Sequence, residues 1–295
     1  MSAEVAPLFA RTLKVRFTQP SDLNDPFEFR PLIDFKGTAE EFRGVVDAKI
    51  AEIFGTADSI LAKMEQLQAT DPSFPKLPVA TQVLRKMFAD NPILGQQFIS
   101  ELQKYKDAAM NEMLGAIQWE ALWEKIQQAL GQAVGIFSMT EDPAHMLMWS
   151  HYAGQHSGMV VEFDETSPWF NQKLAPADEF RHLVRVSYVQ NPHPRMWKQV
   201  SGSDVLYTKN AEWIYEREFR IIRPLKDGTE VSPGKFCFDV PPDVVCGIIF
   251  GCRTTPALEQ EIRGYVASNP SLRHIRFKRA KLMGGGKIEV VDATL

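Results

Sequence analysis

Cysteine is scarce in this chain. The sequence contains three, Cys237, Cys246 and Cys252, and no Cys-x-x-Cys pair. An odd number at this spacing indicates neither a disulfide framework nor a zinc knuckle. We therefore predict free thiols that stay reduced in the cytoplasm. The first residues, Met-Ser-Ala-Glu-Val-Ala-Pro, also lack the basic region and the apolar run of a secretion signal.

Long apolar runs and an excess of basic residues are missing as well. No stretch of about 18 uninterrupted apolar residues occurs, so we expect no membrane span. The formal net charge is -4, whereas domains that bind nucleic acid in general are usually basic. Binding to bulk DNA is therefore not expected, and we interpret the short basic run at residues 273–281 as a solvated strand face.

Residues 38–133 carry apolar side chains at helical spacing, which predicts several helices. Thr38 followed by Glu41 fits a capping box at the start of the first helix. Three prolines interrupt the pattern further on, and a new helix is expected to begin near Pro78. We interpret the Met and aromatic residues of this region as core packing and find no chemistry in it.

The pattern turns to short β-rich segments after residue 133. Strands are predicted at residues 134–139, 159–163, 183–188, 218–223, 235–240, 244–251, 274–278 and 287–291, with helical pieces at 144–154 and 256–266. Further short strands are expected within residues 13–35. The layout predicts an α+β fold with a mixed or mainly antiparallel sheet. We expect a single domain over residues 1–295, in which residues 38–133 form a helical insertion or subdomain.

Residues 146–158 set two histidines, two serines, a tyrosine and a tryptophan between apolar segments, which is typical of a ligand site. His151 lies on the predicted short helix and has the reference pKa of a general acid or base. It can also donate a hydrogen bond to a phosphate. A structural role for His151 and His156 is the alternative. Their spacing does not fit a His-x-x-x-His zinc site, so we assign no metal ligand.

Residues 24–28 form a second polar cluster near the start of the chain. Asn24, Asp25 and Glu28 can face a cleft as hydrogen-bonding groups. Alternatively, Asp25 closes an Asx turn that Pro26 stiffens. Both interpretations can hold together, because functional residues often lie on rigid turns.

A third cluster spans residues 213–220. Glu216 and Glu218 share one face if residues 215–220 are extended, and Arg220 joins them. Glu162 lies on the face of another predicted strand. Two carboxylates on one face repel each other unless a cation or a proton lies between them. Arg220, Lys209 or a metal can fill that place, and a structural salt-bridge cluster is the alternative.

Together, the motifs in these clusters resemble those of a large bacterial family catalogued as domain of unknown function 2971. The resemblance rests on residues 18–28, 137–138, 148–158 and 209–220, and it covers nearly the whole chain outside the helical insertion. It implies a cytoplasmic accessory or effector protein, encoded near phage-defence genes in some members, without a settled reaction. Members usually open with a Tyr-x-Tyr-Arg-like strand, which residues 1–13 do not contain. The resemblance therefore leaves an altered or inactive protein as one expectation.

Our leading hypothesis is a nucleotide-using enzyme similar to ADP-ribosyltransferases, with NAD as its substrate. Such enzymes carry a Ser or Thr on a strand, here Thr18 or Ser138, and a late Glu-x-Glu. Carboxylates stabilise a developing cation at a sugar carbon. The predicted catalytic residues are Glu218, Glu216 and His151. The predicted substrate-binding residues are Asn24, Asp25, Glu28, Trp149, Tyr152, His156, Lys209 and Arg220.

Two other functions stay open at this point. In a Mg²⁺-dependent nuclease or phosphodiesterase, Asp25, Glu162, Glu216 and Glu218 would hold the ion, because Mg²⁺ prefers oxygen ligands. In a non-catalytic module, the cleft would sense a small ligand and the helical insertion would contact a protein partner.

Overall fold

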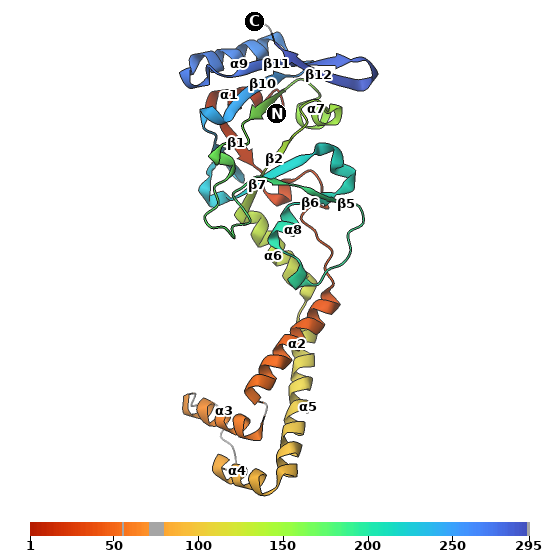
Figure 1. Ribbon diagram of the computed structural model, residues 1–295, viewed down its shortest axis with the longest axis vertical. Coiled ribbons are helices and arrows are strands. Elements are labelled where there is room, and N and C mark those ends of the chain that lie inside the picture. Colours follow the sequence, from red (N-terminus) through yellow and green to blue (C-terminus); the bar gives the residue numbers. More distant parts are fainter. Residues whose placement is uncertain (55, 71–79, 294–295) are drawn as a thin grey trace. The chain divides into compact units, whose positions relative to one another are not determined.

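The computed structural model describes residues 1–54, 56–70 and 80–293, and Figure 1 shows its helices and strands. The chain forms two compact units. Unit 1 comprises Met1–Leu32, Lys125–His193 and Val200–Leu295, and unit 2 comprises Ile33–Glu124 and Pro194–Gln199. Unit 1 contains the strands, which are mostly antiparallel, so the predicted α+β class is confirmed.

Unit 2 is helical. Its elements are α2 (Phe35–Phe54), α3 (Ala57–Thr70), α4 (Thr81–Asp90), α5 (Pro92–Ala116) and the first turn of α6 (Trp119–Ala133). The predicted capping box at Thr38 is wrong, because α2 begins before it. The Asp34 carboxylate accepts the backbone N–H of Gly37 at 2.9 Å, and the Thr38 hydroxyl donates to the Asp34 carbonyl. Pro78, near which a helix start is expected, lies outside the described residues.

Two antiparallel sheets of three strands each are linked in unit 1. In spatial order their strands are β8 (Thr229–Ser232), β9 (Lys235–Asp239), β1 (Lys14–Phe17), β2 (Val134–Thr140), β7 (Glu218–Pro224) and β4 (Val184–Arg185). A bridge between Thr18 and Ile136 joins the two halves, because these residues exchange two backbone hydrogen bonds of 2.8 Å. β7 is therefore paired on both sides.

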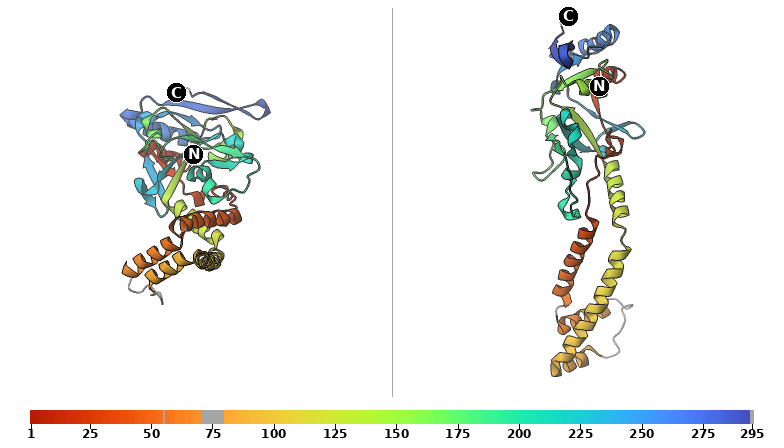
Figure 2. Two further views of the ribbon diagram at one scale, coloured as in Figure 1. Left: turned by 60° about the horizontal axis from the view of Figure 1, so that its bottom comes forward. Right: turned by 90° about the vertical axis from the view of Figure 1, so that its right-hand side faces the viewer.

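A third sheet of unit 1 carries four strands. In spatial order they are β12 (Lys287–Asp292), β11 (Arg276–Met283), β10 (Val245–Phe250) and β3 (Met159–Phe163). β10 and β11 are parallel and are connected through α9 (Pro256–Ser268), which packs beside α1 (Ala6–Thr12). Buried apolar side chains from α1, α9, β1, β7 and β10 form the largest core cluster. Figure 2 shows the β11–β12 hairpin reaching beyond the body of the unit.

Shorter elements complete unit 1. They are α7 (Met146–Tyr152), β5 (Ser187–Val189), α8 (Gly202–Leu206), β6 (Thr208–Asn210) and the 3-10 turn η4 (Ala211–Glu216). The strand predicted at residues 183–188 is divided between β4 and β5, and the strands expected within residues 13–35 reduce to β1. No helix within the described ranges combines the length and the apolar content that a bilayer span requires.

Candidate functional site

β7 places Glu218 and Arg220 on one buried face of the sheet. η4 ends at Glu216, and Arg217 then takes a left-handed conformation, with φ 45° and ψ 48°. The extended conformation assumed for the whole of residues 215–220 is therefore wrong for its first half. Residues two apart on a strand share a face, and Glu218 and Arg220 are only 4% and 2% exposed.

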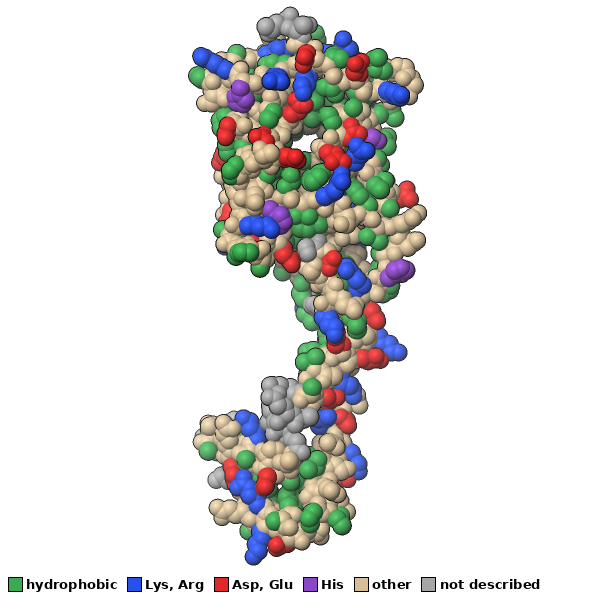
Figure 3. Space-filling view, viewed as in Figure 1, with side chains coloured by type: hydrophobic (Ala, Val, Ile, Leu, Met, Phe, Trp, Pro, Cys, Tyr) green, Lys and Arg blue, Asp and Glu red, His purple; other side chains and the backbone are tan. Residues whose placement is uncertain are grey.

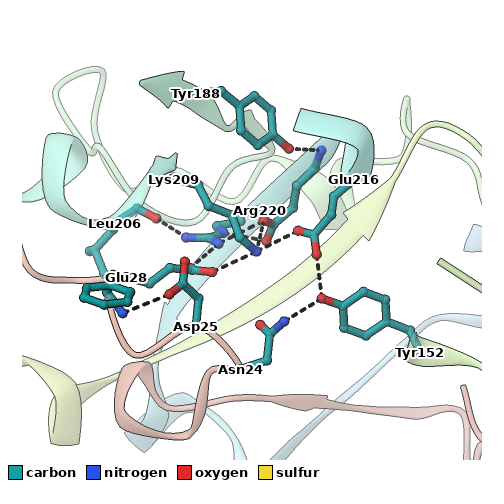
Figure 4. Close-up of polar contacts among 11 residues, drawn as sticks. Asn24, Asp25, Glu28, Tyr152, Tyr188, Leu206, Lys209, Glu216 and Arg220 are labelled. Atoms are coloured by element: carbon teal, nitrogen blue, oxygen red, sulfur yellow. Dashed lines mark hydrogen bonds and ion pairs between the residues drawn. The ribbon is translucent and has the colours of Figure 1, made fainter. Parts of the chain in front are cut away.

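A buried ionic network forms around the ammonium of Lys209, which lies on β6. The Lys209 Nζ lies 2.6 Å from Glu216 Oε2, 2.8 Å from Glu28 Oε1 and 3.4 Å from Glu218 Oε2 (Figure 4). The four side chains are at most 5% exposed. Segments far apart in the sequence therefore meet at one ammonium group.

Arg220 completes the network. Its Nε and Nη2 donate to the Glu218 carboxylate at 2.6 and 2.9 Å, and its Nη1 donates to the Leu206 carbonyl at 2.8 Å. Nη2 also donates to the Glu28 carboxylate. A guanidinium has five donors in a rigid planar fork, which suits several acceptors at once. Glu28 and Glu218 thus each contact both cations of the network.

The network holds three carboxylates and two cations, so it carries one negative charge in excess when all five groups are ionised. Burial by itself raises the pKa of Glu218, but Arg220 and Lys209 outweigh it and hold that pKa below the usual value. Burial lowers the pKa of Lys209, yet the carboxylates of Glu218 and Glu28 raise it above the usual value. Both groups are therefore charged at neutral pH.

Tyr152 links the network to the surface. Its hydroxyl donates to Glu216 Oε1 at 2.5 Å and accepts from Asn24 Nδ2 at 2.8 Å (Figure 4). The residue is 39% exposed. Burial, and then the Glu216 carboxylate, raise the pKa of the Tyr152 phenol well above its usual value.

Ser138 is a second link to solvent. It pairs with Arg220 in the β2–β7 register, is exposed, and its side chain hydrogen-bonds to Glu218. The space-filling view shows an opening in unit 1 between the level of α7 and that of β2 and β7, with acidic side chains at its rim (Figure 3). The buried carboxylates of Glu216 and Glu218 are thus each hydrogen-bonded to the hydroxyl group of an exposed residue, Tyr152 or Ser138.

Aromatic rings continue from Lys209 toward α7. The Lys209 Nζ lies 4.8 Å from the centroid of the Trp213 ring, a cation–π contact. Trp213 is followed by Tyr215 at 6.0 Å between ring centroids, and Tyr215 stacks on His145 at 5.4 Å. Trp213 contacts the network at Lys209, and the series ends at His145, the residue that precedes α7.

Residues 24–28 contain both an Asx turn and a residue of the buried ionic network. The Asp25 carboxylate accepts the backbone N–H of Phe27 at 2.9 Å, which is the Asx-turn bond that the sequence allows. Glu28 enters the network directly.

Tyr188 also contacts the network, although the sequence did not single it out. Its hydroxyl accepts the backbone N–H of Glu218 at 2.8 Å. A single tyrosine in a short strand gave no pattern that would have identified it.

The remaining residues of the 146–158 segment lie apart from the network. His151 is exposed, and its ring contacts that of Tyr152 edge-on. Trp149 is 1% exposed and packs with Ala153, Ile249 and Ala280. His156 lies 3.1 Å from the Ser150 hydroxyl. None of these three predicted site residues contacts a carboxylate of the network through a described interaction.

The acidic residues predicted for Mg²⁺ binding are not all together. Glu162 pairs with Lys278 of β11 at 2.8 Å, whereas Glu216 and Glu218 surround Lys209. Among residues 1–54, 56–70 and 80–293, no group of three or more His, Cys, Asp or Glu side chains is arranged to hold a metal ion. The Lys209 ammonium occupies the position between the carboxylates.

A family model described as Protein of unknown function (DUF2971) matches residues 148–221. Searches of curated proteins and of solved structures gave no match. The matched segment extends from α7 into β7 and contains Tyr152, Lys209, Glu216, Glu218 and Arg220, while Glu28 lies before it. Residues 148–221, which supply most of the buried network, therefore identify this chain as similar to the DUF2971 family.

Proposed function

We propose that unit 1 is an enzyme that acts on a nucleotide and transfers its ribosyl group, in a reaction similar to that of ADP-ribosyltransferases. The observation that carries this proposal is the excess negative charge of the buried network together with the position of Glu216. One oxygen of that carboxylate is bound by Lys209, and the other faces the half-exposed Tyr152. A substrate that develops positive charge would be stabilised at this place.

The proposed reaction uses Tyr152 as a gate. The Tyr152 hydroxyl donates a hydrogen bond to the outer oxygen of Glu216. A ribose hydroxyl of NAD has the same donor chemistry and would replace it when the Tyr152 side chain turns outward. Nicotinamide leaves with the electrons of its bond to the ribose, and water or an acceptor hydroxyl forms the new bond to the oxocarbenium-like carbon and releases its proton. The carboxylates of Glu216 and Glu218 lower the energy of that transition state. Arg220 and Lys209 hold the pKa of Glu218 below its usual value, and Lys209 forms an ion pair with Glu216 at 2.6 Å.

One observation favours a different class of function. Glu216 and Glu218 are 2% and 4% exposed and are paired on most sides, which suits a ligand-sensing module that does not turn over substrate. The Mg²⁺-dependent hydrolase has less support, because an ammonium group already separates the carboxylates. A cytoplasmic location fits the three free cysteines, Cys237, Cys246 and Cys252.

The test uses the purified chain and two readouts: thermal stability with NAD, ATP or Mg²⁺, and release of nicotinamide from NAD. A ligand that binds the native state raises the melting temperature by mass action. We expect a shift with NAD in the wild type and in Glu216→Gln, because glutamine keeps the shape of the side chain. Release of nicotinamide should fall about 100-fold in Glu216→Gln, which is typical of losing one stabilising group at a developing charge.

Glu141→Gln is the matched control, since Glu141 is a surface carboxylate of the same unit that pairs with Arg185. It should change neither readout. Equal nicotinamide release by wild type and Glu216→Gln would refute the catalytic assignment. Stabilisation by NAD without any nicotinamide release would favour the ligand-sensing module, and stabilisation by Mg²⁺ alone would favour the hydrolase.

A further inference from the structure

A second polar pair lies on the other side of α7 from Tyr152. The Ser150 Oγ lies 3.1 Å from the His156 Nε2, within hydrogen-bond distance. Both residues are half-buried, so the pair keeps some contact with solvent. Neither side chain contacts Glu28, Lys209, Glu216, Glu218 or Arg220 through a described interaction.

The backbone around His156 holds the imidazole in place at a conformational cost. Gly154, Gln155 and His156 take φ values of 57°, 54° and 70° in succession. A residue other than glycine is strained in this region, and such residues gather at functional sites. The backbone carbonyl of His156 accepts the N–H of Arg253 at 3.0 Å, which fixes the loop against the segment before α9.

The imidazole ring is also fixed by packing. The Trp149 ring is nearly parallel to it, with an interplanar angle of 8° and 6.3 Å between centroids. Trp149 is itself anchored, because its Nε1 donates to the Pro143 carbonyl at 2.7 Å. Burial, and then the charge of Arg253, lower the pKa of His156. The imidazole is therefore neutral at pH 7 and has one unprotonated nitrogen.

We propose that Ser150 and His156 form a nucleophilic hydroxyl–imidazole pair that reacts with activated esters, at a site separate from the ionic network. An imidazole within hydrogen-bond distance of a serine hydroxyl is the arrangement that activates this weak nucleophile. The Ser150 hydroxyl also donates a hydrogen bond to the Met146 carbonyl at 3.1 Å. A rotation of the hydroxyl hydrogen from that carbonyl to Nε2 prepares the attack.

Every bond and proton in the reaction is accounted for by Ser150, His156, the ester and water. Ser150 Oγ forms a bond to the acyl carbon while its proton moves to His156 Nε2. The bond from the acyl carbon to the leaving alcohol breaks, and the alcohol takes the proton from Nε2. Water then cleaves the acyl-serine and restores the hydroxyl. His156 Nδ1 is buried without a hydrogen-bond partner among the described residues. The pair therefore lacks the third, orienting group of a catalytic triad, and we expect slow turnover.

The test is covalent labelling with an alkyl fluorophosphonate, followed by peptide mass spectrometry. The Ser150 oxygen displaces fluoride from phosphorus, and its proton passes to His156. We expect the label on Ser150 in the wild type, no label at that position in Ser150→Ala, and labelling about 100-fold slower in His156→Asn. Asparagine suits this position because it tolerates left-handed backbone conformations.

Ser157→Ala is the matched control, since the Ser157 hydroxyl lies in the same loop but donates to the Gly154 carbonyl at 2.6 Å. It should react like the wild type. The melting temperature of each variant establishes that it is folded, and His156→Gln replaces His156→Asn if the latter is not. An unlabelled wild type, a label on another residue, or an unchanged rate in the folded His156 variant would each overturn the proposal.

Discussion

The guanidinium of Arg220 donates a hydrogen bond to the carboxylate of Glu28, 192 residues away in the sequence. The two side chains are 2% and 1% exposed. Because β7 is paired on both sides and the turn at residues 24–28 lies beside it, this contact ties the start of the chain to the interior of the sheet. The stability of unit 1 should therefore depend strongly on the charge balance of the network.

Removing one cation should destabilise the protein strongly. Lys209→Met leaves three buried carboxylates with Arg220 alone, and a buried charge without its partner costs about 3–5 kcal/mol. Urea unfolding should show a loss of this size in the free energy of unfolding. Lys235→Met, at an exposed position of β9, is the control and should change it by less than about 0.5 kcal/mol. A similar small loss in Lys209→Met would contradict the charge balance proposed here.

The network should also make stability depend on acid pH through Glu218. The pKa of Glu218 in the folded protein lies below its ordinary value of 4.5. A carboxylate with a lowered folded pKa contributes stability above its unfolded pKa, and that contribution disappears as the pH falls toward the folded pKa. Unfolding free energies measured from pH 7 to pH 3 should therefore fall more steeply below about pH 4.5 in the wild type than in Glu218→Gln. Parallel curves would show that Glu218 does not have a lowered pKa.

Replacing Arg223, a second buried arginine, should change the free energy of unfolding far less than replacing Lys209. Its guanidinium lies 4.3 Å from the Trp169 ring centroid and 5.5 Å from that of Phe17, and no carboxylate pairs with it directly among the described residues. Burial lowers the pKa of Arg223 to about 10. An unpaired charge is costly to bury, and an apolar side chain of similar volume avoids that cost. Arg223→Met should therefore change the free energy of unfolding by less than about 1 kcal/mol, as measured with urea.

A loss of several kcal/mol in Arg223→Met would show that the aromatic contacts and the hydrogen bond to the Trp169 carbonyl stabilise the guanidinium more than burial penalises it. Arg223→Lys serves as the comparison. It keeps the charge but cannot stack as a planar guanidinium does, so it should be less stable than Arg223→Met.

The close approach of the His156 loop to the end of β10 should make Gly251 irreplaceable. A Cβ atom at Gly251 would lie 2.1 Å from the His156 carbonyl oxygen. Gly251→Ala should therefore cost about 3 kcal/mol or more, because backbone would have to move. Gly264, on α9, has open space around its Cβ position, and Gly264→Ala should stabilise the protein by about 0.5–1 kcal/mol. Melting temperatures of both variants test this, and equal effects would contradict it.

Local patterns in the sequence determined most of the secondary structure. Strand β3 and the helical character of unit 2 follow from the periodicity of apolar residues, which reports the face that each element buries. The wrong predictions concern positions where a side-chain hydrogen bond or a backbone turn overrides the local propensity. Asp34 caps α2 in place of Thr38, and the left-handed Arg217 interrupts the extended segment assumed before β7.

The composition of the site was also visible in the sequence, since Glu28, Lys209, Glu216, Glu218 and Arg220 all lie in dense polar clusters. Only the tertiary structure decided which of them meet. The ammonium of Lys209 can balance Glu28 and Glu216 because a turn at residues 24–28, β6 and η4 converge on it. His151, equally conspicuous in the sequence, faces solvent instead. Contact between segments far apart in the chain is set by how strands pair and pack, and a single sequence carries no local record of that pairing.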